Sequence, residues 1–91
     1  MKQLRFTSRF KKDFKRFEKD PLRVAAFERI AQMLIDESPI PAQYRPHLLK
    51  GRYKGYMECH IESDFLLIWF DPNTDIVDLV RMGSHSELFK K

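Results

Sequence analysis

Cysteine and long apolar runs are what this chain has least of. A single cysteine, Cys59, excludes an internal disulfide and fits a reducing cytoplasm. No stretch approaches the roughly 20 apolar residues that a helix needs to cross a bilayer, and the first residues lack the apolar segment of a signal peptide. We therefore expect a cytoplasmic protein with no membrane association.

The chain also lacks the length for more than one domain. Its 91 residues predict a single domain, 1–91. A domain this small buries roughly two-thirds of the surface of its unfolded chain and has no room for a deep cavity. An active site would then be a shallow groove, which suits a polymer or a protein partner better than a small metabolite.

Basic residues are concentrated near the start of the chain, whose overall charge is +4. The first twenty residues hold eight Lys and Arg against three Asp and Glu, whereas residues 46–91 hold six against seven. A basic segment of this kind attracts phosphate backbones or acidic proteins. The alternative, a helix face that is merely solvated, stays open on charge alone.

The first half of the sequence predicts one strand and two helices. Residues 3–7 alternate as a short strand, and Ser8 is the expected N-cap of a helix over residues 9–19. Phenylalanines at positions 10, 14 and 17 form an apolar stripe on that helix. Asp20 then caps a helix over residues 22–37, with Pro21 in its first turn and positions 24, 27, 31 and 34 on one apolar face.

The second half predicts strands after a proline-rich loop over residues 38–46. Residues 56–61 alternate with period two, residues 65–70 are a continuous apolar run typical of a central strand, and residues 76–82 form another strand. Ser84 and Glu87 have capping-box spacing for a short C-terminal helix. Because helices and strands are segregated, we predict an α+β domain, with a helical hairpin packed on one face of an antiparallel sheet of four to five strands.

All three histidines, His47, His60 and His85, lie in the second half of the chain. No CxxC, HExxH or acidic metal-binding motif accompanies them. Cys59 neighbours His60 on a strand, so the two side chains point to opposite faces and do not share a metal ion. We expect no metal site and no cofactor.

Period-two alternation places Tyr56, Glu58 and His60 on one face of their strand and assigns the intervening residues to the core. The three polar side chains either line a groove or simply form the wet side of an antiparallel sheet. Taken alone, their position favours the second interpretation.

Three further residues stand where site residues gather on a rigid scaffold, at strand ends and turns. Asp64 lies in the turn after His60, Arg81 ends a strand, and His85 follows a Gly-Ser break. Each has a structural alternative, since His85 would also suit a helix terminus and Arg81 would also pair with Asp78 or Glu58. The functional hypothesis therefore depends on the set.

As a set, two histidines, a carboxylate and an arginine supply what metal-free RNA cleavage requires. A general base removes the proton of the 2′-OH, a general acid protonates the departing 5′ oxygen, and a cation stabilises the charged phosphorane. Histidine serves as acid or base at neutral pH because its ordinary pKa is near 6.5. Such chemistry needs a 2′-OH, so the expected substrate is RNA.

Three motifs in the second half resemble those of YafQ-like toxins in the RelE/ParE toxin superfamily. YRPHLLKGRYKG over residues 44–55 is similar to their Y-x-x-H-x-L-x-G-x-x-x-G stretch. HIESDFLLIW over residues 60–69 is similar to H-x-x-x-D followed by an apolar run, and RMGSHSELF over residues 81–89 is similar to R-x-G-[ST]-H-x-x-L-F. The order and spacing of the three make the resemblance specific.

The resemblance implies a RelE-like fold and a ribosome-dependent mRNA endoribonuclease, the toxin of a type II toxin–antitoxin pair. It implies His60, Asp64 and His85 in acid–base work and Arg81 on the scissile phosphate. His47 would contact the RNA and Phe89 would position a base or the C-terminal segment. Implied partners are a cognate antitoxin, the ribosome with its mRNA, and operator DNA through the antitoxin complex.

Two positions depart from the relatives, which carry Asp in place of Glu58 and Trp in place of Phe65. We therefore leave Glu58 out of the expected catalytic set and expect Phe65 to offer an aromatic face for stacking. Within the resemblance, the basic helix is expected to bind ribosomal RNA through its phosphates, with the residues Lys11, Lys12, Lys15, Arg16 and Lys19. Two rival hypotheses remain, a non-catalytic RNA- or antitoxin-binding module and a ribonuclease that needs no ribosome.

Overall fold

The computed structural model describes residues 1–89 as one α+β unit, so the last two residues of the expected domain lie outside it. Five strands form a single sheet in the order β1-β5-β4-β3-β2. In sequence order the elements are β1 (Gln3–Phe6), α1 (Ser8–Lys15), α2 (Pro21–Ile35), the 3-10 turn η1 (Ala42–Tyr44), β2 (His47–Leu48), η2 (Gly51–Tyr53), β3 (Met57–Glu62), β4 (Phe65–Phe70), β5 (Ile76–Gly83) and α3 (His85–Leu88).

The sheet confirms the predicted fold class, with one parallel pair in an otherwise antiparallel arrangement. β2, β3, β4 and β5 are antiparallel neighbours joined by short connections. β1 instead pairs in parallel with β5, the last strand of the chain, with Gln3 opposite Ile76 and Phe6 opposite Leu79. The parallel direction is possible because α1, α2 and three strands separate the two segments, whereas a hairpin turn would force them antiparallel.

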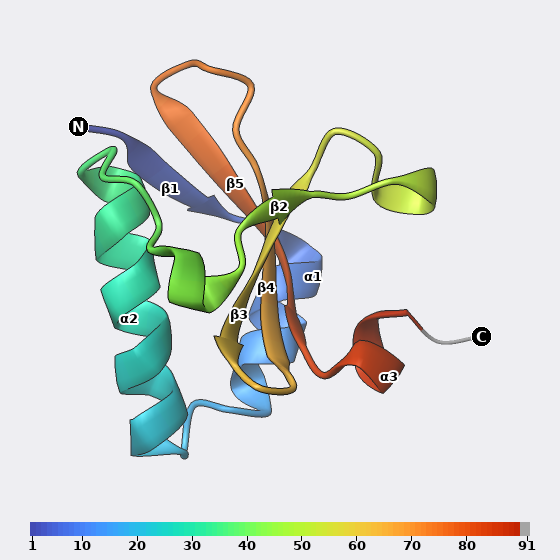
Figure 1. The fold of residues 1–91 in the computed structure, drawn as a ribbon. Coiled ribbons are helices and arrows are strands. Elements are labelled where there is room, and N and C mark those ends of the chain that lie inside the picture. Colours follow the sequence, from blue (N-terminus) through green and yellow to red (C-terminus); the bar gives the residue numbers. More distant parts are fainter. Residues whose placement is uncertain (90–91) are drawn as a thin grey trace.

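Helices α1 and α2 cover one face of the sheet, and α3 lies on the other side (Figure 1). Alternate residues of β3 and β4 point toward α1 and α2, as period two requires. The main core consists of Phe10, Phe17, Ala26, Phe27, Ile30, Ala31, Leu34, Cys59, Ile61, Phe65, Leu67, Trp69, Val77, Leu79 and Met82. None of the helices described within residues 1–89 is long and apolar enough to cross a membrane.

The start of α1 differs from the prediction by one residue. Thr7, which we had assigned to the strand, is the N-cap, because its Oγ1 accepts the Phe10 N–H at 3.2 Å. The same hydroxyl donates to the Leu79 carbonyl at 2.8 Å, which fixes Thr7 against β5. Ser8 was therefore the wrong cap, since Thr7 already occupies the capping position and Ser8 becomes the first helical residue.

The helices are also shorter than predicted at their C-terminal ends. α1 ends at Lys15, and residues 16–19 form a turn in which Phe17 still reaches the core. The second helix begins as expected, because Asp20 accepts the Arg23 N–H at 3.2 Å and Pro21 occupies its first turn. It ends at Ile35, and two residues later Glu37 adopts a positive φ of 57°, which lies outside the right-handed helical region.

Asp13 closes the gap that the short strand β1 leaves at the edge of β5. The pairing of β1 with β5 stops at Phe6 and Leu79, so the Met82 N–H has no strand partner on that side. The Asp13 carboxylate, 4% exposed on α1, accepts this N–H at 3.0 Å and the Arg81 Nε at 2.7 Å. A buried carboxylate therefore joins the first helix to the strand that leads to α3.

Asp13→Ala should lower the free energy of unfolding by about 3–5 kcal/mol, because it leaves the Arg81 guanidinium and a backbone N–H without their acceptor. The matched control is Glu18→Ala, an exposed acid at the end of the same segment, with an expected change within about 0.5 kcal/mol. Urea unfolding of both variants checks this. A loss below about 1 kcal/mol for Asp13→Ala would contradict the structural role given to this carboxylate.

Candidate active site

The open face of the sheet carries Glu58 and His60, which alternate along β3 with the core residues Cys59 and Ile61. Glu58 lies opposite Ile68 of β4, and His60 opposite Leu66. Ile68 and Leu66 pack with Leu88 of α3 and not with α1 and α2. The predicted faces of β3 are therefore confirmed, and both polar side chains stand on the face away from the two long helices.

Glu58 is buried on this face, so the expectation of a wet strand surface was wrong for it. Its side chain is 3% exposed, and its Oε1 lies 3.1 Å from Nε2 of His47, the residue paired with it on β2. Its Oε2 is buried and has no hydrogen-bond partner among the described residues. Burial arises because β2 and α3 flank this face, an arrangement that strand alternation alone does not indicate.

The His47 ring is fixed at both nitrogens. Nδ1 lies 2.7 Å from the Arg45 carbonyl oxygen, and since a carbonyl only accepts, Nδ1 carries a proton. Nε2 faces the Glu58 carboxylate, 3.1 Å from its Oε1. His47 thus holds Glu58 in place and leaves the second carboxylate oxygen directed elsewhere.

Asp64 and His85 form a second pair at the edge of the same face. Asp64, in the turn between β3 and β4, accepts the His85 backbone N–H at 3.0 Å and the His85 Nδ1 at 3.1 Å. The backbone N–H first, and the His85 side chain second, hold the pKa of Asp64 below its ordinary value. With Nδ1 donating to the carboxylate, Nε2 of His85 is the ring atom available for proton transfer.

The capping box of α3 fixes His85 as the first residue of that helix. Ser84 Oγ accepts the Glu87 N–H at 3.2 Å, and Glu87 Oε1 accepts the Ser84 N–H at 2.8 Å, as predicted. A Cβ at position 83 would stand 2.8 Å from Glu87 Oε1, so a side chain there would displace this flexible carboxylate from the capping box. Glycine therefore lets the strand turn into the helix with its cap intact.

The two pairs converge around His60. Its ring centroid lies 6.3 Å from that of His47 and 5.7 Å from that of His85. One ligand atom each of Glu58, His60 and His85 lies within 4.8 Å of the others. Two imidazoles and a buried carboxylate therefore share one small, partly exposed area, as acid–base chemistry requires.

Aromatic rings border this area on the side of α3. Phe89 lies 6.0 Å from the His85 ring, and Tyr53 meets Phe89 edge-on at 5.9 Å. Tyr53, from η2, was missed by the sequence analysis, although it lies inside the first of the three motifs. Phe65 is not part of the border, so the expectation of a stacking face there was wrong. It is 2% exposed and packs on Phe17 in the core at 4.7 Å, because period two turns it toward the helices.

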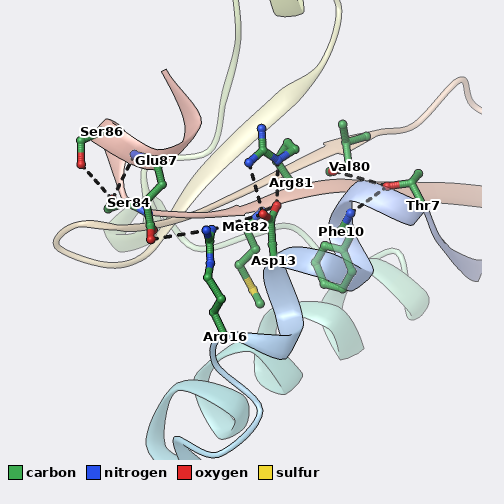
Figure 2. A network of polar contacts seen from close by, with 10 residues as sticks. All are labelled: Thr7, Phe10, Asp13, Arg16, Val80, Arg81, Met82, Ser84, Ser86 and Glu87. Atoms are coloured by element: carbon green, nitrogen blue, oxygen red, sulfur yellow. Dashed lines mark hydrogen bonds and ion pairs between the residues drawn. The ribbon is translucent and has the colours of Figure 1, made fainter. Parts of the chain in front are cut away.

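Arg81 pairs with Asp13, and neither proposed structural partner, Asp78 or Glu58, contacts it as an ion pair within residues 1–89 (Figure 2). Its Nε and one terminal nitrogen donate to the two Asp13 oxygens at 2.7 and 3.2 Å. Asp13 raises the pKa of Arg81, with a smaller contribution from Tyr53. Arg81 therefore stands between α1 and the Tyr53 side of the candidate active site.

The basic residues of α1 fall on two separate faces. Lys12 and Arg16 border a pocket with Arg9, Asp13 and Arg81. Lys11 and Lys15 instead border an apolar groove lined by Phe6, Phe10, Phe14 and Phe27, and Lys19 lies beyond the end of the helix, exposed. The expected set of five is therefore not one continuous surface.

Cys59 lies in the core and the hollow beside His60 is open, as the sequence predicted. Burial first, and the Glu58 carboxylate second, raise the pKa of Cys59 to about 12, so this thiol is no nucleophile near neutral pH. The hollow beside His60 is open and measures about 350 Å³. It is lined by Gln43, Tyr44, Arg45, His60, Ile61, Glu62 and Ser63.

Comparisons with known proteins agree with the family expected from the three motifs. The mRNA interferase toxin YafQ of Escherichia coli K12 is 29% identical over 89 residues, which are 97% of this chain and 96% of the relative. A copper-bound mutant toxin from Helicobacter pylori superposes with a TM-score of 0.87 at 34% identity, covering 98% of this chain and all of that one. E. coli YafQ in its complex with DinJ gives 0.85 at 29% identity over 98% and 99%.

A family model described as "Bacterial toxin of type II toxin-antitoxin system, YafQ" matches residues 2–90. That match spans nearly the whole chain and includes all the side chains of the candidate active site. The chain therefore belongs to the YafQ family of bacterial type II toxin–antitoxin toxins.

Proposed function

We propose that this protein is an mRNA endoribonuclease that cleaves RNA on the ribosome, without a metal ion, through the 2′-OH of the substrate. The observation that carries the proposal is the convergence of Glu58, His60 and His85 within 4.8 Å on an open face of the sheet. The mRNA interferase activity of the E. coli relatives supports it.

Glu58 fits the role of general base better than the sequence suggested. Its Oε2 is buried and without a partner among residues 1–89, while Oε1 is held by His47 at 3.1 Å. Oε2 therefore has no hydrogen bond within the described chain to give up when it accepts one from a substrate hydroxyl. Glu58 would remove the proton of the 2′-OH, with His60 beside it to orient that hydroxyl or share the proton.

His85 fits the role of general acid. Asp64 binds Nδ1 and the backbone N–H of His85, so the ring is held with Nε2 outward. A proton carried on Nε2 would be transferred to the departing 5′ oxygen. In this scheme Asp64 orients and stabilises the acid and does not itself transfer a proton to RNA.

The remaining residues would position the phosphate and the bases. Arg81 donates two of its N–H groups to Asp13, which leaves one end of its guanidinium for a phosphate oxygen. Phe89 and Tyr53 offer ring faces and edges beside His85 for a base. The site is open, so we expect the ribosome to supply the orientation of the message and free RNA to be cleaved slowly.

The proposed physiological partner is a cognate antitoxin. The structure of E. coli YafQ with DinJ is a complex of a related toxin with its antitoxin. By analogy, binding of an antitoxin would cover the open face and block cleavage, and the pair would bind operator DNA through the antitoxin.

A bound metal ion is a second candidate at the same site, which the sequence motifs gave no reason to expect. Two imidazole nitrogens and one carboxylate oxygen suit Cu²⁺ or Zn²⁺, and H. pylori relatives are described as copper-bound and metal-bound. Since the same side chains must transfer protons, such an ion would inhibit cleavage, and the protein would need none for activity.

His85→Ala should reduce cleavage by about 10²–10⁴-fold, because it removes the general acid. The measurement is primer extension on a translated reporter mRNA after induced expression in a bacterium. The matched control is Ser86→Ala, the exposed neighbour on α3, which should cut like wild type. If wild type and His85→Ala arrest growth equally and no cuts appear, the protein is a binding module that blocks translation by occupancy.

Glu58→Gln should lower the single-turnover cleavage rate on programmed ribosomes by at least about 10²-fold, since an amide keeps the shape but cannot accept the 2′-OH proton. Circular dichroism melting shows whether this variant still folds. We expect it to, because the amide that replaces the carboxylate can still form a hydrogen bond with His47. A Glu58→Gln enzyme that cuts at the wild-type rate would contradict the assignment of the base.

Addition of Cu²⁺ or Zn²⁺ to the purified protein should inhibit cleavage of RNA, and EDTA should restore the rate. His60→Ala should weaken metal binding in isothermal titration calorimetry at least about tenfold, because one of three ligands is lost. A rate that rises with added metal and disappears with chelator would instead make the ion a cofactor and overturn the metal-free mechanism.

A further inference from the structure

Helical spacing divides the cations of α1 between two surfaces. Arg9, Lys12 and Arg16 are three and four residues apart, so they lie on one face of the helix. Lys11 and Lys15, four residues apart, border the phenylalanine groove defined by Phe6, Phe10, Phe14 and Phe27. The two faces therefore have different chemistry, one rich in cations around the buried Asp13 and one apolar with a charged rim.

The cationic face forms a pocket against β5. Arg9, Lys12, Asp13, Arg16 and Arg81 line an open hollow of about 430 Å³. Neither Arg9 nor Lys12 forms an ion pair with any residue in the part of the chain that the structure describes. The pocket thus contains two cations that no acid within residues 1–89 neutralises.

The pocket and its rim contain fewer acidic than basic side chains, and both acids already bind other groups of the protein. Asp13 is buried and bound to Arg81 at 2.7 Å and to Arg16 at 3.3 Å. Glu87, at the rim, lies 3.7 Å from Arg16 and also closes the capping box of α3. Four cations against two acids leave an excess of positive charge around an open hollow, which attracts an anion.

We infer that the α1 side of this pocket, formed by Arg9, Lys12 and Arg16, binds a backbone phosphate of RNA at a place separate from the bond that is cut, while Arg81, the wall on β5, serves the scissile phosphate of the proposed function. The class of ligand rests on the proposed function, which makes RNA the substrate. Guanidinium groups bind phosphate oxygens through paired N–H donors, and Lys12 adds a point charge.

Arg81 connects the pocket to the active site. Asp13 fixes its Nε and one terminal nitrogen, so the guanidinium plane is set before any ligand arrives. His85 follows four residues further along the chain, just past the turn at Gly83 and Ser84 that begins α3. A phosphate held by the α1 side of the pocket would therefore be a neighbour of the scissile phosphate on the message, or would belong to a ribosomal RNA strand beside it.

The phenylalanine groove is the better place for a protein partner, since apolar walls are what protein interfaces bury at their centre. The phosphate pocket is lined by charged residues, with no aromatic or aliphatic residue among those that the structure describes there. An acidic antitoxin segment in the pocket is therefore the rival, and the experiment includes it.

The test compares two double variants that each remove two positive charges from α1. Arg9→Gln/Lys12→Gln alters the pocket and leaves the Asp13 hydrogen bonds intact, whereas Lys11→Gln/Lys15→Gln alters the other face. Both are made in the His85→Ala background, so that binding is measured without cleavage. The ligands are a single-stranded RNA oligonucleotide, ribosomes without message, and the cognate antitoxin, each over a range of salt concentrations.

Arg9→Gln/Lys12→Gln should weaken RNA or ribosome binding about tenfold. The slope of log affinity against log salt should fall by about 0.7 for each single-strand phosphate that the protein no longer neutralises. Lys11→Gln/Lys15→Gln should keep the wild-type slope. A change with the oligonucleotide identifies a message phosphate, and a change with ribosomes alone identifies a ribosomal RNA phosphate.

Equal losses of affinity in the two double variants would overturn the proposal, because the effect would then be general charge. Unchanged RNA and ribosome binding with weaker antitoxin binding would also overturn it, in favour of a protein site. The proposed nuclease activity fails separately, if wild-type protein shows the pocket-dependent salt slope but cuts no message.

Discussion

The interaction between the buried Glu58 carboxylate and His47 Nε2, at 3.1 Å, is the one on which the active site depends. A carboxylate that is 3% exposed is costly to bury without a partner. His47 reduces that cost from the neighbouring strand, and the Arg45 carbonyl fixes His47 in turn. Only one carboxylate oxygen is satisfied within residues 1–89, and the other is buried without a hydrogen-bond partner, in a side chain that lies close to His60 and His85.

Asp13, a second buried carboxylate, also has a structural role, because it fixes the strand that leads to His85. Asp13 binds the exposed edge of β5 where β1 has ended, and it holds Arg81 at the same time. β5 runs directly into Gly83, Ser84 and α3, so the position of His85 depends on how that edge is closed. α1 is thereby fixed relative to β5 and to α3, which carries His85.

Local sequence patterns predicted the fold class and the polar face of β3. They did not predict features that arise from contacts between segments far apart in the sequence. Alternation in residues 56–61 correctly separated Glu58 and His60 from Cys59 and Ile61, and the capping box at Ser84 was confirmed. Burial of Glu58 was not predictable, because it comes from β2 and α3. The parallel pairing of β1 with β5 has no local signal either. Asp13 did have one, since it lies three residues after Phe10 on the core side of an otherwise basic helix.

The chemical ends of the cleaved message test the central claim most directly. Ribosome-bound mRNA cut by the wild-type protein should carry a 2′,3′-cyclic or 3′-phosphate on one fragment and a 5′-hydroxyl on the other, because the 2′-OH is the nucleophile. A single 2′-deoxynucleotide at the cut position should then abolish cleavage there while ribosome binding persists. Fragments with a 5′-phosphate and a 3′-hydroxyl, or unimpaired cutting of the 2′-deoxy message, would contradict the mechanism, since water or a metal-bound hydroxide would then be the attacking group.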